Sequence, residues 1–163
     1  MTDLAALFKS LGWNDAVTFI QSGNVIFNDP GKISRSALTA NQEKAIFDRF
    51  SFTVPVMIRT DQELKDLIVV NPFLDEINFD PSRLAVIFLH DKPEDIQIQK
   101  VKDISYPPDK FKIIGSEIFI YCPNGFGKTK LYTNFFETKM GVIGTGRNWR
   151  SVTTILNIAE SKF

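Results

Sequence analysis

Two glycine-marked turns in the last third of the chain place cations beside backbone that is predicted to begin a helix. The first basic turn runs Pro123-Asn124-Gly125-Phe126-Gly127-Lys128-Thr129-Lys130, and the second runs Thr145-Gly146-Arg147-Asn148-Trp149-Arg150-Ser151. Unpaired N–H groups already give a helix N-terminus partial positive charge. An exposed Lys or Arg there interacts unfavourably with this charge, by about 0.3–1 kcal/mol. A bound anion makes the interaction favourable. The two turns therefore indicate an anion site.

The expected ligand-binding residues are those of the two turns. They are Asn124, Gly125, Gly127, Lys128, Thr129, Lys130, Arg147, Asn148, Trp149 and Arg150. Backbone N–H groups of a glycine-rich turn, with Lys and Thr, can hold a phosphate. An Arg fork binds phosphate or carboxylate in a bidentate manner, and a Trp ring can stack on a base.

Each turn also has a plain structural interpretation, which the sequence leaves open. The first basic turn is then a tight strand-to-helix connection with solvated lysines. In the second, Asn148 caps the last helix, Trp149 packs on the core and the arginines are exposed.

The first basic turn is not a P-loop. That pattern needs a glycine five residues before its Gly-Lys pair, and Cys122 stands at that position. A P-loop also follows a strand of a parallel sheet, whereas a hairpin is predicted before this turn. ATP hydrolysis of the P-loop kind is therefore rejected, and only the weaker prediction of phosphate binding is kept.

The remaining reactive residues do not form a site by spacing. His90 is predicted on the surface at a strand end, and Cys122 as a small buried hydrophobe. One Cys excludes an intramolecular disulfide and fits a reducing compartment. A lone Cys and a lone His argue against a Cys/His metal cluster, so we expect no metal and no cofactor. Gln21-Ser22-Gly23-Asn24 is interpreted as a hairpin turn.

Composition and charge exclude few classes of protein or partner. The 163 residues suit one domain or two small subdomains, and the formal net charge of zero offers no whole-chain argument for a nucleic acid or membrane partner. Residues 124–150 are locally basic, because five cations less Glu137 leave four positive charges. No apolar run approaches the roughly 20 residues of a membrane span, and no signal peptide is visible. We expect a cytoplasmic protein without a membrane partner.

Hydrophobic periodicity predicts alternating helices and short strands. In the first half we expect a helix over residues 2–11, a hairpin of 16–20 with 25–28, a helix near 36–50, a strand over 52–59 and a helix after residue 60. Leu38, Ile46, Phe47 and Phe50 are predicted to face inward in the second of these helices. In the second half we expect a strand over 84–89, a helix over 93–104, a hairpin of 111–114 with 117–121, and helices over 128–138 and 149–160.

This order predicts an α+β fold of two small sandwich-like subdomains with ferredoxin-like, βαββα character. The subdomain boundary is expected in the 72–81 loop, which gives subdomains of 1–75 and 76–163. The first half lacks the opening strand of a split βαββαβ sheet. That absence predicts an exposed sheet edge, which is a known route to pairing between chains.

Several blocks of the sequence resemble one bacterial family. They are Leu11-Gly12-Trp13, Ile20-Gln21-Ser22-Gly23-Asn24-Val25-Ile26-Phe27, Val54-Pro55-Val56-Met57-Ile58-Arg59-Thr60, Asn71-Pro72-Phe73, Tyr121-Cys122-Pro123-Asn124-Gly125 with Lys130-Leu131, and Thr145-Gly146-Arg147-Asn148-Trp149 with Val152. In this order, over nearly the whole chain, they are similar to the family called domain of unknown function 1697. The resemblance implies an α+β, ferredoxin-like fold and no established activity.

The start of the chain departs from that resemblance. Family members usually begin with a strand and a glycine-rich turn of the type Leu-Arg-Gly-Ile-Asn-Val-Gly-Gly, whereas this sequence opens with Met1-Thr2-Asp3-Leu4, where the first helix of the family would begin. We therefore predict a gap, or pairing with another chain, at the corresponding sheet edge.

Three functions follow as alternatives. The first is a module that binds a phosphate-bearing ligand, either a nucleotide or single-stranded nucleic acid, through the two basic turns. The second is a small-molecule enzyme in which Lys128, Arg147 and Asn148 clamp an anion, although the sequence shows no acid–base pair or nucleophile. The third is a protein-interaction module, for example a homodimer, that pairs through the exposed sheet edge.

Overall fold

The protein is an α+β chain, described here by a computed structural model of all its residues, 1–163. It consists of two compact units. The first unit comprises residues 1–62 together with 153–163, and the second unit comprises residues 63–152. The division into subdomains of residues 1–75 and 76–163 stays a prediction.

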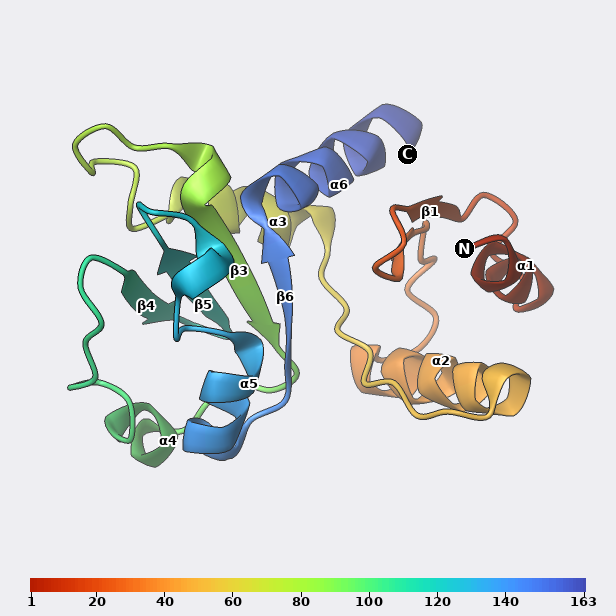
Figure 1. Ribbon diagram of the computed structural model, residues 1–163. Helices are drawn as coiled ribbons and strands as arrows, with labels where there is room; N and C mark the ends of the chain where they lie inside the picture. Colours follow the sequence, from red (N-terminus) through yellow and green to blue (C-terminus); the bar gives the residue numbers. More distant parts are fainter. The chain divides into compact units, whose positions relative to one another are not determined.

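The first unit begins with a helix, a hairpin and a second helix (Figure 1). Helix α1 spans Thr2–Ser10, strands β1 and β2 span Val17–Phe19 and Asn24–Ile26, and α2 spans Arg35–Phe50. The strands pair antiparallel, with Thr18 opposite Val25, which confirms the predicted hairpin. Gly23 has a φ of 78°, a conformation that glycine adopts without the usual steric cost.

Helix α2 is capped as its sequence suggests, but its inward face differs from the prediction. The Ser34 side chain accepts a hydrogen bond from the Ala37 N–H at the helix start. The buried positions are Leu38, Gln42 and Ile46, one every four residues. The prediction that Phe47 faces inward is wrong, since this side chain is 54% exposed. The third buried position of α2 is held by a polar residue, Gln42, which a pattern of apolar residues cannot predict.

The strand predicted over 52–59 is also wrong. This segment has extended character but belongs to no sheet, and β2 pairs only with β1. A strand needs a neighbouring strand for its backbone groups, and neither sheet includes this segment.

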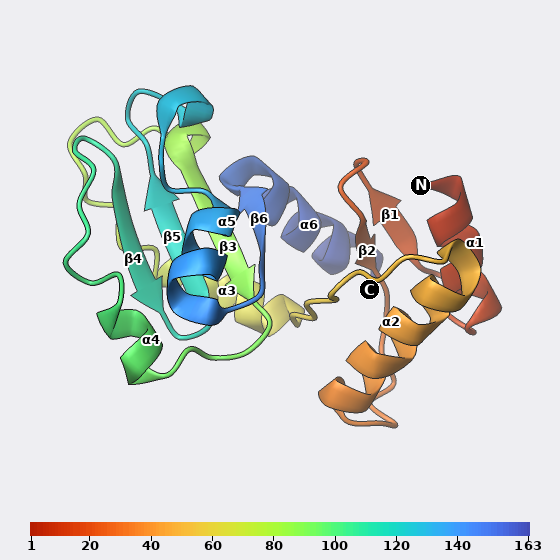
Figure 2. The ribbon, with the colours of Figure 1, turned by 60° about the horizontal axis from the view of Figure 1, so that its bottom comes forward.

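The second unit is built on a four-stranded antiparallel sheet (Figure 2). Strands β3 (Leu84–Leu89), β4 (Lys110–Ile114), β5 (Glu117–Tyr121) and β6 (Gly144–Asn148) lie in the order β4-β5-β3-β6. Strand β3 is antiparallel to both of its neighbours. Its continuous apolar run predicted this central place.

Both faces of this sheet are covered. On one face, Ile87 and Leu89 of β3 pack with Phe136 and Met140, which follow in the chain after the hairpin. On the other face, the rings of Phe73 and Phe79 stack on Tyr121 at centroid distances of 5.6 and 5.7 Å. Pleating sends alternate residues to opposite faces, so Arg147, opposite Val86, lies on the Tyr121 side.

The helices after residue 60 agree with their predictions in part. Helix α3 (Asp61–Val69) and helix α6 (Trp149–Lys162) confirm the predicted helices. The helix predicted over 93–104 is shorter, α4 (Asp95–Gln99), and the Glu94 N–H donates to Gln97 Oε1 at its start. The helix predicted over 128–138 is replaced by a 3-10 turn at Phe126–Lys128, then α5 (Thr133–Phe136) and a π-helical turn at Glu137–Gly141.

Strand β6 was missed by the sequence patterns. Its sequence, Gly-Thr-Gly-Arg-Asn, lacks apolar alternation, so tertiary pairing with β3 decides its conformation. Gly144 is required by packing, since a Cβ there would lie 2.8 Å from the Ile87 Cγ2 atom. None of the helices has both the length and the apolar character that a membrane crossing requires.

Candidate anion-binding site

Strand register brings the two basic turns to the same end of the second unit's sheet. Tyr121, at the end of β5, lies opposite Leu84, and Asn148, at the end of β6, lies opposite Ala85. Since β5 and β6 flank β3, the two strand ends are about 10 Å apart, which is two inter-strand spacings. The turns therefore leave the sheet side by side, with the start of β3 between them.

Arg83 adds a third cation at this end of the sheet. It precedes β3, and its carbonyl accepts a hydrogen bond of 2.9 Å from the Cys122 N–H. Its guanidinium lies over the backbone of Gly125, because a Cβ built at Gly125 would be 2.5 Å from Arg83 Nη1. Gly125 also has a φ of 85°. Only glycine fulfils both conditions without a shift of the neighbouring cation.

Asp80 is the acidic group beside this cation. Its Oδ2 atom lies 3.4 Å from Arg83 Nε, and its Oδ1 accepts from the Ser82 N–H at 2.9 Å. Hydrogen bonds from Ser82, followed by the charge of Arg83, lower the pKa of the Asp80 carboxyl from its ordinary value. Asp80 contacts Arg83 through Nε, whereas the Nη1 atom is the one close to Gly125.

The first basic turn divides into exposed and structural residues. Asn124, Gly127, Lys128 and Lys130 are exposed, and Lys130 Nζ lies 5.1 Å from the centroid of the Tyr106 ring. Phe126 and Gly127 open the 3-10 turn, where N–H groups have no intrahelical partner. Thr129 is 3% exposed, and its Oγ1 accepts from the Leu131 N–H. Thr129 therefore holds the turn in shape.

The second basic turn is mostly occupied by structural contacts. Arg147 donates to Thr145 Oγ1 at 2.6 Å and to the Gly146 carbonyl at 2.8 Å. Asn148 Oδ1 accepts from the Ser151 N–H at 2.8 Å, which caps α6. Trp149 is 8% exposed, so its ring packs in the interior. Of the four candidates in this turn, Arg150 is the exposed cation.

Arg147 is half-buried and lies in a strand, not at a helix start. Desolvation lowers the pKa of its guanidinium from the ordinary value. Its side chain belongs to the Tyr121 face of the sheet, while Gly146 and Asn148 belong to the other face. The backbones of the two turns thus lie close together, but the Arg147 side chain lies on the opposite face of the sheet from Gly146 and Asn148.

Cys122 and His90 lie outside the exposed part of this site. Cys122 is fully buried, and desolvation raises the pKa of its thiol. His90 follows β3 at the opposite end of the sheet, where its Nδ1 lies 2.8 Å from Asp91 Oδ2. No group of three or more His, Cys, Asp or Glu side chains is placed to hold a metal ion. N–H groups at a turn and exposed cations are the kinds of group that hold an anion in other proteins.

Arg83 is the residue that sequence reasoning missed. It stands about forty positions before the first basic turn, and nothing in the local pattern joins the two. The hydrogen bond from Cys122 to Arg83 depends on the β3–β5 register, which only the assembled sheet defines. The available signal was the Asp-Pro-Ser-Arg turn, which places a cation directly before the predicted central strand.

Comparison with protein families matches residues 1–119 to the family described as Protein of unknown function (DUF1697). A search of curated proteins and a search of solved structures found no match to this chain.

Proposed function

We propose that this chain, which belongs to the DUF1697 family, binds a phosphate-bearing ligand, either a nucleotide or single-stranded nucleic acid. The binding site comprises the backbone of Gly125, Phe126 and Gly127 with the side chains of Arg83 and Lys128. Arg150 extends it as a second point of contact.

The observation that supports this proposal is the position of the Arg83 guanidinium over Gly125. It sets a fork-shaped donor beside the N–H groups that open the 3-10 turn, and Lys128 lies exposed in the same turn. Arg recognises phosphate oxygens through paired N–H donors, and successive backbone N–H groups form an anion-binding concavity. Together, Arg83, Lys128 and the N–H groups of the 3-10 turn supply hydrogen-bond donors and positive charge to a phosphate without a metal ion.

The ligand class follows from the exposed groups. Three cations from separate chain segments, Arg83, Lys128 and Arg150, suit a ligand with more than one phosphate. Trp149 is buried, so base stacking on that ring does not contribute. Binding then depends on phosphates more than on bases, and should tolerate changes of base sequence.

The test is a titration of the protein with ATP and with a labelled single-stranded oligonucleotide, followed by fluorescence anisotropy. If the three cations each contact a phosphate, raising the salt concentration from about 50 to about 200 mM should weaken oligonucleotide binding about 18-fold. Arg83→Ala and Lys128→Ala should each weaken binding and flatten this salt dependence.

Lys102→Ala is the matched control, because Lys102 is exposed and follows α4, at the other end of the sheet. It should leave affinity and salt dependence unchanged. Absence of binding to both ligands, or equal losses in the Lys102 and Lys128 variants, would contradict the proposal.

A further inference from the structure

An exposed tyrosine follows the first basic turn. Exposure alternates along residues 128–132, where Lys128, Lys130 and Tyr132 are exposed while Thr129 and Leu131 are only 3% and 2% exposed. The two buried side chains hold this segment against the interior of the second unit, so the three exposed ones project away from it. Tyr132 is 50% exposed. A planar ligand can therefore reach the Tyr132 ring.

The other aromatic rings near this segment are occupied by contacts within the chain. The ring centroids of Tyr106 and Phe135 are 5.9 Å apart, and those of Phe135 and Phe136 are 5.0 Å apart. Lys130 Nζ lies 5.1 Å from the centroid of the Tyr106 ring, so one face of that ring already holds a cation. Tyr132 belongs to none of these contacts. It is the ring of this segment that offers a free face.

Residues 128–132 connect the two basic turns in space. The segment begins where the 3-10 turn ends, at Lys128, and is followed directly by α5, which begins at Thr133. A Cβ built at Gly146, in the second basic turn, would lie 2.9 Å from Thr133 Oγ1. Helix α5 also lies beside β6 in both views of the chain (Figures 1 and 2). Tyr132 therefore stands between Lys128 and the strand that leads to Arg150.

We propose that the phosphate-bearing ligand is single-stranded nucleic acid, and that one of its bases stacks on Tyr132, with phosphates on both sides of that base at Lys128 and Arg150. This inference rests on the proposed function, because it extends the same phosphate site. A base with a phosphate on each side occurs within a polynucleotide strand, whereas ATP carries all of its phosphates on one side. Cations that follow the backbone, with an aromatic ring for a base, are the arrangement by which proteins bind single strands.

The charges around the segment agree with a polyanionic strand. Two carboxylates of neighbouring segments are engaged elsewhere. Desolvation, with the charge of Asp109, raises the pKa of the Cys122 thiol, so this carboxylate is directed toward the thiol. Glu137 Oε1 accepts a hydrogen bond of 3.0 Å from the Gly144 N–H. Neither carboxylate forms an ion pair with Lys128, whose charge is available to a phosphate.

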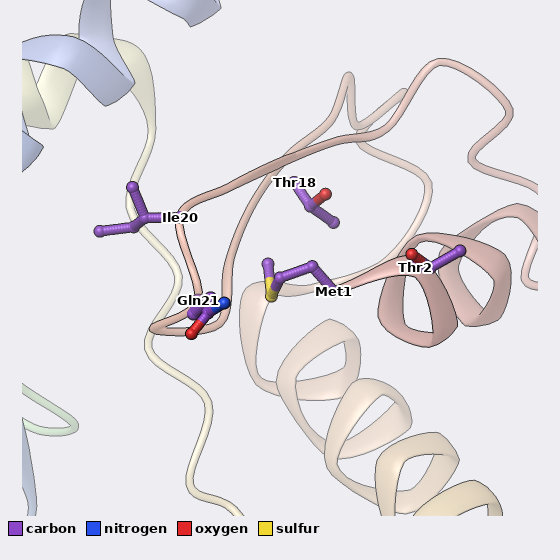
Figure 3. Close-up of a pocket in the computed structure, with 5 residues that line it drawn as sticks. All are labelled: Met1, Thr2, Thr18, Ile20 and Gln21. Atoms are coloured by element: carbon purple, nitrogen blue, oxygen red, sulfur yellow. The ribbon is translucent and has the colours of Figure 1, made fainter.

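Two cavities of the first unit are less suitable for this ligand. One is an open cavity of about 620 Å³ (Figure 3), lined by Met1, Thr2, Thr18, Ile20 and Gln21. None of these side chains carries a charge. The other, of about 480 Å³, is lined by Asp15 and Asp29 as well as Lys32, so carboxylates outnumber cations there. Neither cavity combines positive charge with an exposed aromatic ring as residues 128–132 do.

The probes are labelled single strands of about ten nucleotides, within the range of site sizes of single-strand-binding domains. Deoxythymidylate and uridylate strands are titrated separately into the full chain and followed by fluorescence anisotropy, and tighter binding of either strand than of ATP supports the inference. Tyr132→Ala should weaken binding about fivefold or more, which is the effect of one lost base stack. The salt dependence should stay that of the unchanged protein, because no cation is removed.

A strand of the same length built from abasic sites separates stacking from phosphate contact. It keeps every phosphate and lacks the bases, so it should bind the unchanged protein about fivefold or more weakly than the thymidylate strand. Tyr132→Ala should leave the affinity for the abasic strand unchanged. If Tyr132 merely supported the fold of the turn, its loss would weaken the binding of both strands.

Two further variants control for the ring and for exposure. Tyr132→Phe keeps the ring and should bind the thymidylate strand as the unchanged protein does. Ile143→Ala is the matched control, because Ile143 is 52% exposed and lies at the opposite end of the sheet, where its carbonyl accepts from the His90 N–H. It should leave affinity unchanged. Should Tyr132→Ala fail to fold, the abasic strand still decides the matter on the unchanged protein.

This inference and the proposed function fail in different ways. Equal binding of the thymidylate and abasic strands would overturn the inference and leave phosphate binding intact. The same holds if Arg83→Ala weakens strand binding while Tyr132→Ala does not, or if ATP binds as tightly as the strands. Absence of binding to ATP and to every strand would remove both.

Discussion

Gly125→Ala tests the arrangement on which the phosphate site depends, and the chain contains a matched control. An alanine at a φ of 85° costs about 1–2 kcal/mol in backbone strain. The reduced freedom of the unfolded chain returns about 0.4–1 kcal/mol. The net loss of unfolding free energy should be about 1 kcal/mol.

Gly127→Ala is the control two residues away. Gly127 has no positive φ, and a Cβ there would meet no atom within 4 Å. This variant should be neutral or more stable by about 0.4–1 kcal/mol. Urea unfolding of both variants should therefore differ by about 1–2 kcal/mol, with Gly125→Ala the less stable.

The same substitution separates strain from displacement of the cation. The new Cβ would lie 2.5 Å from Arg83 Nη1, the mobile end of a long side chain, so the guanidinium moves at little cost in stability. Nucleotide affinity should fall because Arg83 leaves its place. In an Arg83→Ala background, Gly125→Ala should keep its stability cost and lose its effect on affinity. Equal stability of the Gly125 and Gly127 variants, or unchanged affinity in Gly125→Ala, would refute the reasoning.

The other predictions concern packing and acid stability. Gln42→Leu should raise the unfolding free energy by about 1 kcal/mol in urea titrations, since it removes a buried donor without a partner; a less stable variant would show that the amide is satisfied. Gly144→Ala should cost about 1–3 kcal/mol by the same measurement, because its Cβ would lie 2.8 Å from Ile87 and 3.3 Å from the Phe88 carbonyl; a neutral result would mean that β6 shifts freely. The folded-state pKa of the Asp80 carboxyl is below its ordinary value, so its contribution to stability is present above the ordinary pKa and is lost as pH falls through the lower folded value. Asp80→Asn should therefore reduce the acid dependence of the melting temperature below about pH 4, and identical acid profiles would contradict this linkage.

Much of the fold follows from local sequence. The apolar run of β3 and the glycine of the β4–β5 turn predicted a central strand and a hairpin, because burial and turn geometry act within a few residues. The predictions failed where pairing with another segment of the chain determines the local conformation. Residues 52–59 have the alternation of a strand but pair with no strand, whereas β6 lacks alternation and is a strand because β3 pairs with it.

The candidate site divides in the same way. The exposed lysines of the first basic turn and the capping role of Asn148 before α6 were among the interpretations that the sequence left open. The position of Arg83 over Gly125 could not be predicted, since it arises from pairing between strands whose register local patterns do not define. The placement of the Arg147 side chain on one face of the sheet also depends on strand β6, which the sequence patterns did not predict.

The most direct test of the proposed function is an NMR titration of the isotopically labelled full chain with ATP, read at the backbone amides. The account predicts saturable shifts concentrated at Gly125, Phe126, Gly127 and Lys128 and at the Arg83 side chain, and their loss in Arg83→Ala. Saturable shifts elsewhere, or none at these amides, would contradict it.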